Sequence, residues 1–269
     1  MAEISAALVK ELRDRTGAPM MDCKRALQET NGDIEAAQRL LRERGAAQAQ
    51  KRAGRETTEG IVLLKTGDGK GSLVAIGCET EPVSKNEEFR AFAERVLDAA
   101  YTTYMQEQIP QLEQEREELI GKIGENVVVR GAARLKADDG DVLAEYVHPP
   151  RNLIGVLVKV RGDNPVAARR LAMHVASAAP RWVRRDDVPA ETIASEREIY
   201  ASSDEVQSKP EQAREKIVEG MLGKRFFAAY PGGVLLDQTW IHDTAKTVAQ
   251  ALADEGLEVV EFVRYALAE

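Results

Sequence analysis

The spacing of apolar residues predicts three short helices at the start of the chain. Ile4, Leu8 and Leu12 recur every four positions and so share one face of a first helix, which breaks at Gly17 and Pro19. A second helix ends at an Asn-Gly pair, and an aspartate N-cap opens the third. We place these boundaries at Asn31-Gly32, at Asp33 and, for the end of the third helix, at Gly45. A unit of this size has little core of its own, which favours docking over catalysis.

Apolar runs further along the chain predict β-hairpins packed with helices. Residues 59–66 and 72–79 are predicted to form strands joined by the turn GDGKG. A helix is expected over 86–109, and a second one over 110–124, beginning at Pro110. The pattern then recurs, with strands at 126–137 and 142–148 around the turn Asp138-Asp139-Gly140, a strand at 153–161 and a helix after Asn164-Pro165. This repetition indicates two related α+β subdomains.

The segment 186–226 differs from both subdomains because it is highly charged and poor in apolar residues. Pro189 and Pro210 divide it, and we expect a helical hairpin that projects from the second subdomain. The chain then returns through a helix at 244–255 and a last strand at 257–267. The expected fold class is α+β, with antiparallel hairpins packed with helices. Its expected parts are a three-helix module with linker, core subdomain N, and core subdomain C with the insertion: 1–54, 55–140 and 141–269.

The composition restricts the class of partner. The 269-residue chain has a net charge of −8, and phosphate neutralisation needs clustered Lys and Arg. We therefore expect a protein partner and no direct nucleic-acid contact, unless a local basic patch outweighs the total. No apolar run approaches the roughly 20 residues that span a bilayer, and the N-terminus is not a signal peptide. Cys23 and Cys78 fit no metal spacing and suit a reducing compartment, so we expect a cytoplasmic protein without membrane contact.

The inventory of catalytic groups is small. The chain has three histidines, His148, His174 and His242, and none belongs to a nucleophile or metal motif. His174 lies in an apolar helical pattern, which is typical of a core histidine. His148, beside two prolines, is either a loop residue or a hydrogen-bond donor to a partner. The stretch GDGKGS resembles a phosphate-binding loop but has the wrong spacing. We therefore predict no catalytic residue, no metal site and no cofactor.

A basic cluster lies where the second subdomain meets the insertion. Arg181, Arg184 and Arg185 could contact RNA, or they could stabilise the negative end of the preceding helix dipole. The acidic pairs Asp138-Asp139 and Asp186-Asp187 are expected to be solvated turn residues.

A set of specific motifs follows one order along nearly the whole chain. They are TGAPMMDCK at 16–24, KRAGR at 51–55, CETEPVSKNEEF at 78–89, YVHPPRNLIGVLV at 146–158, AMHVASAAP at 172–180, EREIY at 196–200, KIVEGMLGK at 216–224 and VLLDQ at 234–238. Together they resemble the bacterial translation elongation factor Ts family. The resemblance implies an N-terminal module of ubiquitin-associated (UBA-like) type. It also implies a non-enzymatic exchange factor that binds elongation factor Tu in its GDP form.

The resemblance also implies which residues contact that GTPase. Thr80, Glu81, Pro82 and Val83 match the family's loop that disturbs the partner's Mg²⁺ site. The other partner-binding candidates are Met20, Met21, Asp22, Lys24, Lys51, Arg52 and His148. The family's loop usually reads Thr-Asp-Phe-Val, so Glu81 and Pro82 replace its acidic residue and its aromatic wedge.

Two expectations concern the end of the chain and its assembly. The chain stops at Glu269, just after the final strand, so we expect it to lack the extra C-terminal helix that some members use on the partner. Some members pair through the insertion, but apolar residues are sparse there, which allows a weak homodimer at most.

Three functions are open at this point. The first is an exchange factor. The second is an interaction module that binds without accelerating exchange, which only Pro82 favours. The third is a hydrolase that uses His148 and a nearby acid, against which stands the absence of a nucleophile–base motif. Thermal stabilisation by elongation factor Tu, but by no small substrate, would separate the first two from the third.

Overall fold

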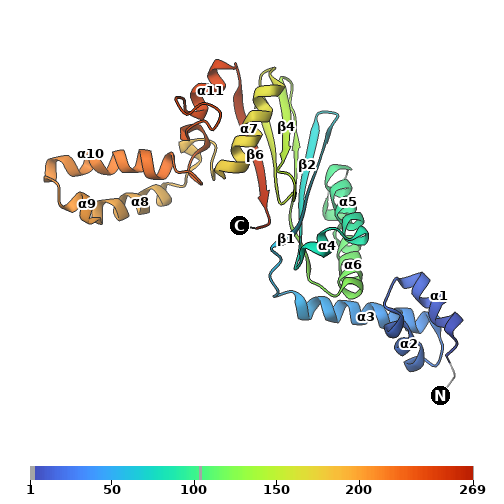
Figure 1. Ribbon diagram of the computed structural model, residues 1–269. Coiled ribbons are helices and arrows are strands. Elements are labelled where there is room, and N and C mark those ends of the chain that lie inside the picture. Colours follow the sequence, from blue (N-terminus) through green and yellow to red (C-terminus); the bar gives the residue numbers. More distant parts are fainter. Residues whose placement is uncertain (1–3, 103–104, 269) are drawn as a thin grey trace.

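The computed structural model describes residues 4–102 and 105–268. The molecule is elongated (Figure 1). A group of N-terminal helices forms one end, two β-sheets with their covering helices form the middle, and a helical hairpin projects at the other end. Among the described residues, no helix has the length and apolar character needed to cross a membrane.

The N-terminal module consists of α1 (Ala6–Thr16), α2 (Met20–Glu29) and α3 (Ile34–Arg52). Ser5 and Asp33 cap α1 and α3 by accepting hydrogen bonds from backbone N–H groups. Gly17 ends α1 in the left-handed conformation, with φ of 65°. The small core of the module contains Val9, Leu12, Cys23, Ala26, Leu27 and Ala37.

The predicted end of the third helix at Gly45 is wrong, because α3 continues to Arg52. Gly45 lies where α3 crosses helix α6 (Met105–Ile123). A Cβ on Gly121 of α6 would lie 3.1 Å from the Cα of Gly45, so the two glycines let the helix backbones approach closely. Ala49, further along α3, packs into the core beneath the first sheet. The glycine therefore serves helix packing and not helix termination.

The first sheet contains β1 (Glu59–Gly67), β2 (Lys70–Cys78) and β3 (Val127–Lys136), antiparallel and in that order. Asp68 and Gly69 form the β1–β2 turn at positive φ, 48° and 67°, as a type I′ hairpin requires. The GDGKGS stretch is thus a hairpin turn, as predicted. Helices α5 (Glu87–Thr102) and α6 cover one face of the sheet and bury Phe89, Phe92 and Ile120 against it.

The predicted pairing of 126–137 with 142–148 is wrong. β3 pairs with β2, in a register from Cys78↔Val127 to Lys70↔Lys136, and the turn at 138–140 leads into the second sheet. The choice of a strand partner depends on tertiary contacts, which the local alternation of residues does not encode.

The predicted helix break at Pro110 is also wrong. α5 already ends at Thr102, and α6 contains Pro110 near its start, where the missing N–H removes a single backbone hydrogen bond. The connection between the two helices lies outside the described residues.

The second sheet repeats the arrangement with β4 (Asp141–Val147), β5 (Ile154–Arg161) and β6 (Glu258–Ala266). In each sheet the register of the middle strand shifts by one residue, after Ala75 in β2 and after Lys159 in β5. Helices α7 (Pro165–Ala178) and α11 (Val248–Asp254) pack on one face. The last helix begins at Val248 and not at 244, because Thr247 and Gln250 form a capping box.

The two sheets pack face to face, with the helices on the outer sides (Figure 1). Val62, Leu73 and Leu157 belong to the apolar layer between them. Gly155 of β5 permits this close approach, since a Cβ there would collide with Val62 and Leu73. The N–H of Val62 also donates to the Asn152 carbonyl oxygen at 2.7 Å, which joins β1 to the β4–β5 loop. The fold is therefore α+β, as predicted.

The charged segment forms the hairpin that projects at the left of Figure 1. Its elements are η1 (Arg185–Asp187), α8 (Ala190–Ser202), α9 (Asp204–Gln207), α10 (Glu211–Met221) and the π-helix η2 (Leu222–Phe227). Pro189 and Pro210 directly precede α8 and α10. Val188, Val206, Val218 and Phe227 form part of its own apolar cluster. The short η3 (Leu235–Asp237) then leads towards α11.

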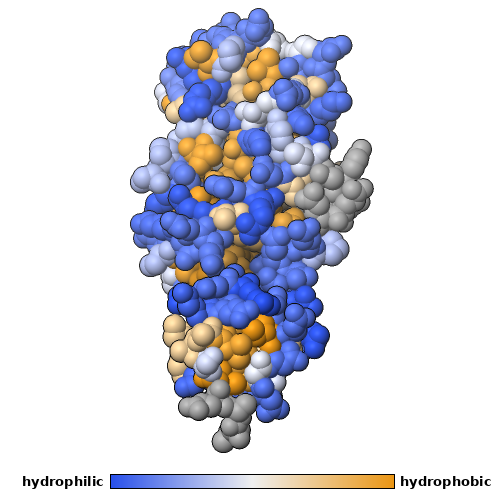
Figure 2. Space-filling model, turned by 90° about the vertical axis from the view of Figure 1, so that its right-hand side faces the viewer, coloured by the Kyte–Doolittle hydropathy of each residue, from blue (hydrophilic) through white to orange (hydrophobic). Residues whose placement is uncertain are grey.

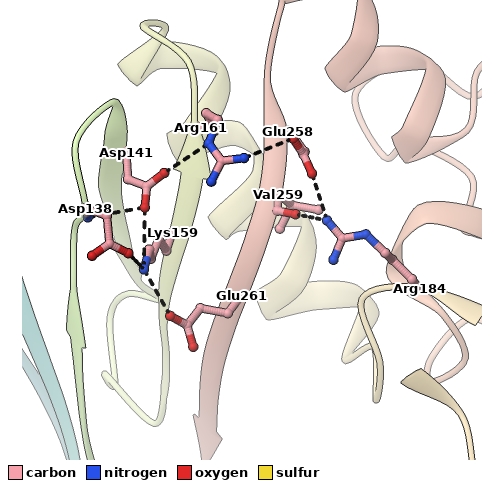
Figure 3. Close-up of polar contacts among 8 residues, drawn as sticks. All are labelled: Asp138, Asp141, Lys159, Arg161, Arg184, Glu258, Val259 and Glu261. Atoms are coloured by element: carbon pink, nitrogen blue, oxygen red, sulfur yellow. Dashed lines mark hydrogen bonds and ion pairs between the residues drawn. The ribbon is translucent and has the colours of Figure 1, made fainter. Parts of the chain in front are cut away.

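A chain of charged side chains ties the base of this hairpin to the second sheet (Figure 3). Arg184 donates to the Val259 carbonyl oxygen at 2.7 Å and pairs with Glu258 at 3.2 Å. The network continues through Arg161, Asp141, Lys159, Asp138 and Glu261. The dipole interpretation of the basic cluster is wrong, because α7 ends at Ala178 with no basic residue in its last turn.

Candidate functional site

The segment Thr80–Val83 lies at the exit of the middle strand of the first sheet. It forms a single helical turn, α4 (Glu81–Ser84), with Thr80 at the N-cap position. Pro82 occupies the first turn, where a missing N–H leaves no bond unmade. Glu81 and Pro82 are exposed, whereas Val83 is half-buried against the core of the first sheet. The turn therefore presents Glu81 and Pro82 to solvent, and Val83 anchors it to the core.

Thr80 is held by a carboxylate from a distant part of the chain. Glu125, just before β3, accepts hydrogen bonds from the Thr80 backbone N–H at 3.0 Å and from its hydroxyl at 2.6 Å. The Cys78 thiol donates to the Thr80 carbonyl oxygen at 3.3 Å. Burial, with the charge of Glu125, raises the pKa of Cys78 to about 12, so this thiol stays protonated and donates. Three contacts thus fix the start of the turn.

The neighbouring Glu79 joins the turn to the linker. Its carboxylate accepts from the Asn126 backbone N–H at 2.7 Å and pairs with Arg55 at 3.3 Å. The Asn126 side-chain amide donates to the Arg55 carbonyl oxygen at 2.9 Å. Sequence reasoning missed Glu79, Glu125 and Asn126 because their role depends on tertiary contacts, and no local motif marks them.

The far end of the turn is also fixed. The Asn86 side chain accepts from the backbone N–H groups of Glu88 at 2.8 Å and Phe89 at 3.2 Å, and so caps α5. The Ser84 hydroxyl instead donates to the Glu81 carbonyl oxygen at 2.7 Å. Asn86, and not Ser84, is therefore the cap of α5. The turn is therefore short and fastened at both ends.

A comparison of the two repeats marks this turn as an addition to the common pattern. In the second repeat, β5 ends at Arg161 and Asn164 already caps α7. In the first repeat, β2 ends at Cys78, and the equivalent cap is Asn86. The extra residues form α4, which has no counterpart between β5 and α7 in the second repeat.

The loop that follows β4 lies close enough to influence the turn electrostatically. Its His148 is exposed, and the ring Nδ1 lies 2.9 Å from the Tyr146 hydroxyl oxygen. Arg151 forms an ion pair with Glu59. The ion pair with Lys85 at 2.8 Å lowers the pKa of Glu81, and the charge of Arg151 lowers it further. The β4–β5 loop and α4 therefore belong to one side of the molecule.

The N-terminal candidates occupy a separate surface. Met20 and Met21 are 53% and 61% exposed at the start of α2, a large apolar exposure for so small a module. Asp22 pairs with Arg25, and Lys24 is exposed. Figure 2 shows a hydrophobic area on the N-terminal module, at the bottom of that view. Figure 1 places this module at the end of the molecule opposite the projecting hairpin.

The two linker candidates differ in their environment. Lys51 is exposed at the end of α3. Arg52 is half-buried and donates to the Gln48 side chain at 3.0 Å and to the Ile120 carbonyl oxygen at 3.4 Å. Arg52 therefore fastens α3 to the C-terminal end of α6, where a cation is electrostatically favoured.

The remaining titratable candidates are structural. Cys23 is buried, and burial raises its pKa. His174 is fully buried, as predicted, and burial lowers its pKa to about 4. Within the described ranges, no group of three or more His, Cys, Asp or Glu side chains is placed to hold a metal ion. The geometry provides exposed surfaces for recognition, and the buried thiols and imidazole are unsuited to attack a substrate.

A family model and several curated proteins are similar to this chain. A family model described as "Elongation factor TS" matches residues 79–269. The curated protein named Elongation factor Ts from Idiomarina loihiensis is 42% identical over 278 residues, covering 99% of this chain and 91% of the relative. Those from Cronobacter sakazakii and Escherichia coli O139:H28 are each 41% identical over 273 residues, covering 100% of this chain and 93% of the relative.

Proposed function

Because the chain belongs to the elongation factor Ts family, whose members are translation elongation factors in protein biosynthesis, we propose that it is a nucleotide exchange factor for the GTPase elongation factor Tu. It binds that GTPase in the GDP form, disturbs the Mg²⁺ and phosphate site, and promotes release of GDP so that GTP can bind. It forms no covalent intermediate. The observation that carries the proposal is the exposed turn Thr80–Val83, fastened at both ends.

Displacement of Mg²⁺ is sufficient to weaken GDP binding. The ion bridges phosphate oxygens and GTPase side chains and neutralises their charge. A segment that shifts the Mg²⁺-binding loops removes this neutralisation. A turn that is already ordered performs such a shift at lower cost than a flexible loop, because it loses little conformational entropy on binding. The hydrogen bonds from Thr80 to Glu125 provide that order.

Pro82 changes the way in which the turn acts. Its ring is smaller than the phenyl ring usual in the family, so it offers fewer contacts, but its fixed φ stiffens the turn. The Glu81 carboxylate beside it is exposed. We therefore assign the displacement to the backbone of the turn and to the Glu81 charge, and Val83 holds the turn on the core.

The other candidates divide between docking and support. Met20, Met21, Asp22 and Lys24 form a docking surface on the module, and Lys51 and His148 extend the contact along the same protein. Arg52 supports this arrangement indirectly through its bonds to α6. The corresponding division is a docking module with linker at 1–54, subdomain N at 55–140, and subdomain C at 141–269 with its insertion at 186–226.

Thermodynamic linkage gives a direct test. If the chain weakens GDP binding, GDP must weaken the binding of the chain by the same factor. Isothermal titration of the chain into nucleotide-free elongation factor Tu and into its GDP·Mg²⁺ form should give clearly tighter binding to the nucleotide-free form. Equal affinities for the two forms would overturn the proposal.

A second candidate function is binding without exchange. The replacement of an aromatic wedge by Pro82 is the observation that favours it. Equal affinities in the same titration, each in the range of a specific complex, would be the result expected for this alternative.

A further inference from the structure

A cleft separates the N-terminal module from helix α6. Its volume is about 660 Å³, and α1, α2 and α3 line one side while α6 lines the other. The cleft is largely polar, and six of its lining residues are Arg or Lys: Arg15, Arg25, Arg39, Arg42, Arg44 and Lys122. A concentration of cations in an acidic protein points to an anionic ligand.

Internal ion pairs use only some of these cations. Arg15, Arg25 and Arg44 pair with Glu11, Asp22 and Glu29. Arg39, Arg42 and Lys122, in contrast, form no ion pair with any part of the chain that the structure describes. Asp22 and Glu29 line the cleft themselves, and two further acidic lining residues, Glu35 and Glu118, offset part of the remaining charge. The cleft nevertheless retains more positive than negative groups.

The three unpaired cations line the same cleft from two different helices, α3 and α6. Arg39 and Arg42 are three residues apart on α3 and so are neighbours on one helical face. Lys122 follows Gly121, which contacts Gly45, and so lines the same cleft from the side of α6. The Lys122 Nζ reaches towards the α1–α2 corner, since it lies 2.8 Å from the position that a Cβ on Gly17 would occupy.

The charge of the whole N-terminal region is consistent with the cleft. Residues 1–55 contain 11 Lys and Arg and 8 Asp and Glu, a net charge of +3, although the complete chain carries −8. Such an asymmetry between parts of a chain is typical of proteins whose basic part contacts a polyanion. The N-terminal region is therefore locally basic, although the net charge of the complete chain is negative.

We propose that this cleft binds phosphate groups of a single-stranded RNA backbone through Arg39, Arg42 and Lys122. The guanidinium fork matches two phosphate oxygens, and the ammonium group supplies a third positive charge. The residues that line the cleft in the described ranges include no aromatic side chain on which a base could stack. Binding is therefore of the backbone type, weak, dependent on salt and independent of sequence.

The test uses fluorescence anisotropy with the full chain and a labelled single-stranded RNA oligonucleotide. With three phosphate contacts, log K should fall with log salt at a slope of about −2, a loss of about 15-fold between 50 and 200 mM salt. The triple variant Arg39→Gln, Arg42→Gln, Lys122→Gln should bind at least about tenfold more weakly at 50 mM salt. A control that loses the same charge on the hairpin, Lys209→Gln, Lys216→Gln, Lys224→Gln, should bind like the native chain.

Competitors identify the ligand chemistry. Pyrophosphate at millimolar concentration should compete, since it presents the same oxyanions. A polyglutamate of equal charge that competed as well as the RNA would overturn the proposal, because the cleft would then recognise negative charge and not phosphate. Equal binding by both triple variants, or no binding at low salt, would overturn it as well. Exchange activity is measured separately, and its failure would leave the RNA result unaffected.

Discussion

Acid should weaken the second core subdomain through one buried side chain, His174. Its ring Nδ1 accepts the Ile241 backbone N–H at 3.4 Å, and its Nε2 lies 3.0 Å from the Gln238 side-chain oxygen. The ring also stacks on Trp240 with a centroid separation of 5.2 Å. Protonation would replace the Nδ1 acceptor by a donor that faces an N–H group. Burial accordingly lowers the pKa of His174 from 6.5 to about 4.

The sign and size of the effect follow from linkage. The unfolded chain takes up the proton near pH 6.5 and the folded chain only near pH 4, so stability is fully present above pH 6.5 and is lost as the pH falls towards 4. At about 1.4 kcal/mol per pKa unit, the complete loss is roughly 3 kcal/mol, and at pH 5 it is about 2 kcal/mol.

Urea denaturation at pH 7 and pH 5 measures this loss. Trp182 and Trp240, the two tryptophans of the chain, lie at the hairpin base and in the core of the second subdomain, so their fluorescence reports on this region. The variant His174→Gln should start less stable at pH 7 but lose about 2 kcal/mol less between the two pH values. The control His148→Gln, at an exposed ring in the loop after β4, should keep the native difference. A native-like pH dependence in His174→Gln would show that protonation of His174 does not cause the loss of stability in acid.

Three further predictions test the site and its support. Glu125→Gln keeps the shape of the side chain but weakens its hydrogen bonds to Thr80. GDP release should therefore slow about three- to tenfold, while the free energy of unfolding changes by under about 1 kcal/mol. An unchanged release rate would show that the turn does not depend on these hydrogen bonds. Gly155→Val should destabilise the chain by at least about 3 kcal/mol in urea denaturation, because the new side chain collides with Val62 and Leu73. The control Gly220→Ala, in open space on α10, should not destabilise it. Similar urea midpoints for the two variants would contradict the close packing of the two sheets. Removal of residues 1–33, which spares α3, should weaken binding to elongation factor Tu at least about tenfold. The circular dichroism spectrum should show that the core remains folded. Native affinity of the truncated chain would exclude a docking role for α2.

Truncation at residue 33 and not at 54 follows from the packing of α3. Ala49 lies in the core of the first sheet, and Arg52 donates to the α6 carbonyl of Ile120. Loss of the whole helix would therefore damage the core itself. The sequence showed the three helices but not this attachment, because a glycine in a helical pattern is read locally as an end.

Sequence periodicity predicted those elements whose stability is local. The apolar face of α5, the hairpin turn at Asp68-Gly69 and the Asn164 cap of α7 all lie where their residue types require. The partner of β3 and the start of α11 did not follow from the sequence. The pairing of β3 depends on contacts between residues far apart in the chain. The start of α11 depends on the capping box of Thr247 and Gln250.

The candidate site shows the same division. The turn Thr80–Val83 was identified through its motif, but the hydrogen bonds that hold it were not. Glu125 is 45 residues away, and the linker residue Arg55 reaches the turn through Glu79. A single carboxylate before a strand has no local signature, so only the folded chain reveals its role.

Release of a fluorescent GDP from elongation factor Tu, with and without this chain, measures the proposed exchange function itself. The Pro82→Phe variant, which restores the family's usual residue, is measured beside it. We expect strong acceleration by the native chain, with at most a modest gain from the phenyl ring. Acceleration by the variant alone would contradict the assignment of displacement to the backbone and Glu81. Binding without acceleration by either protein would contradict the exchange function itself.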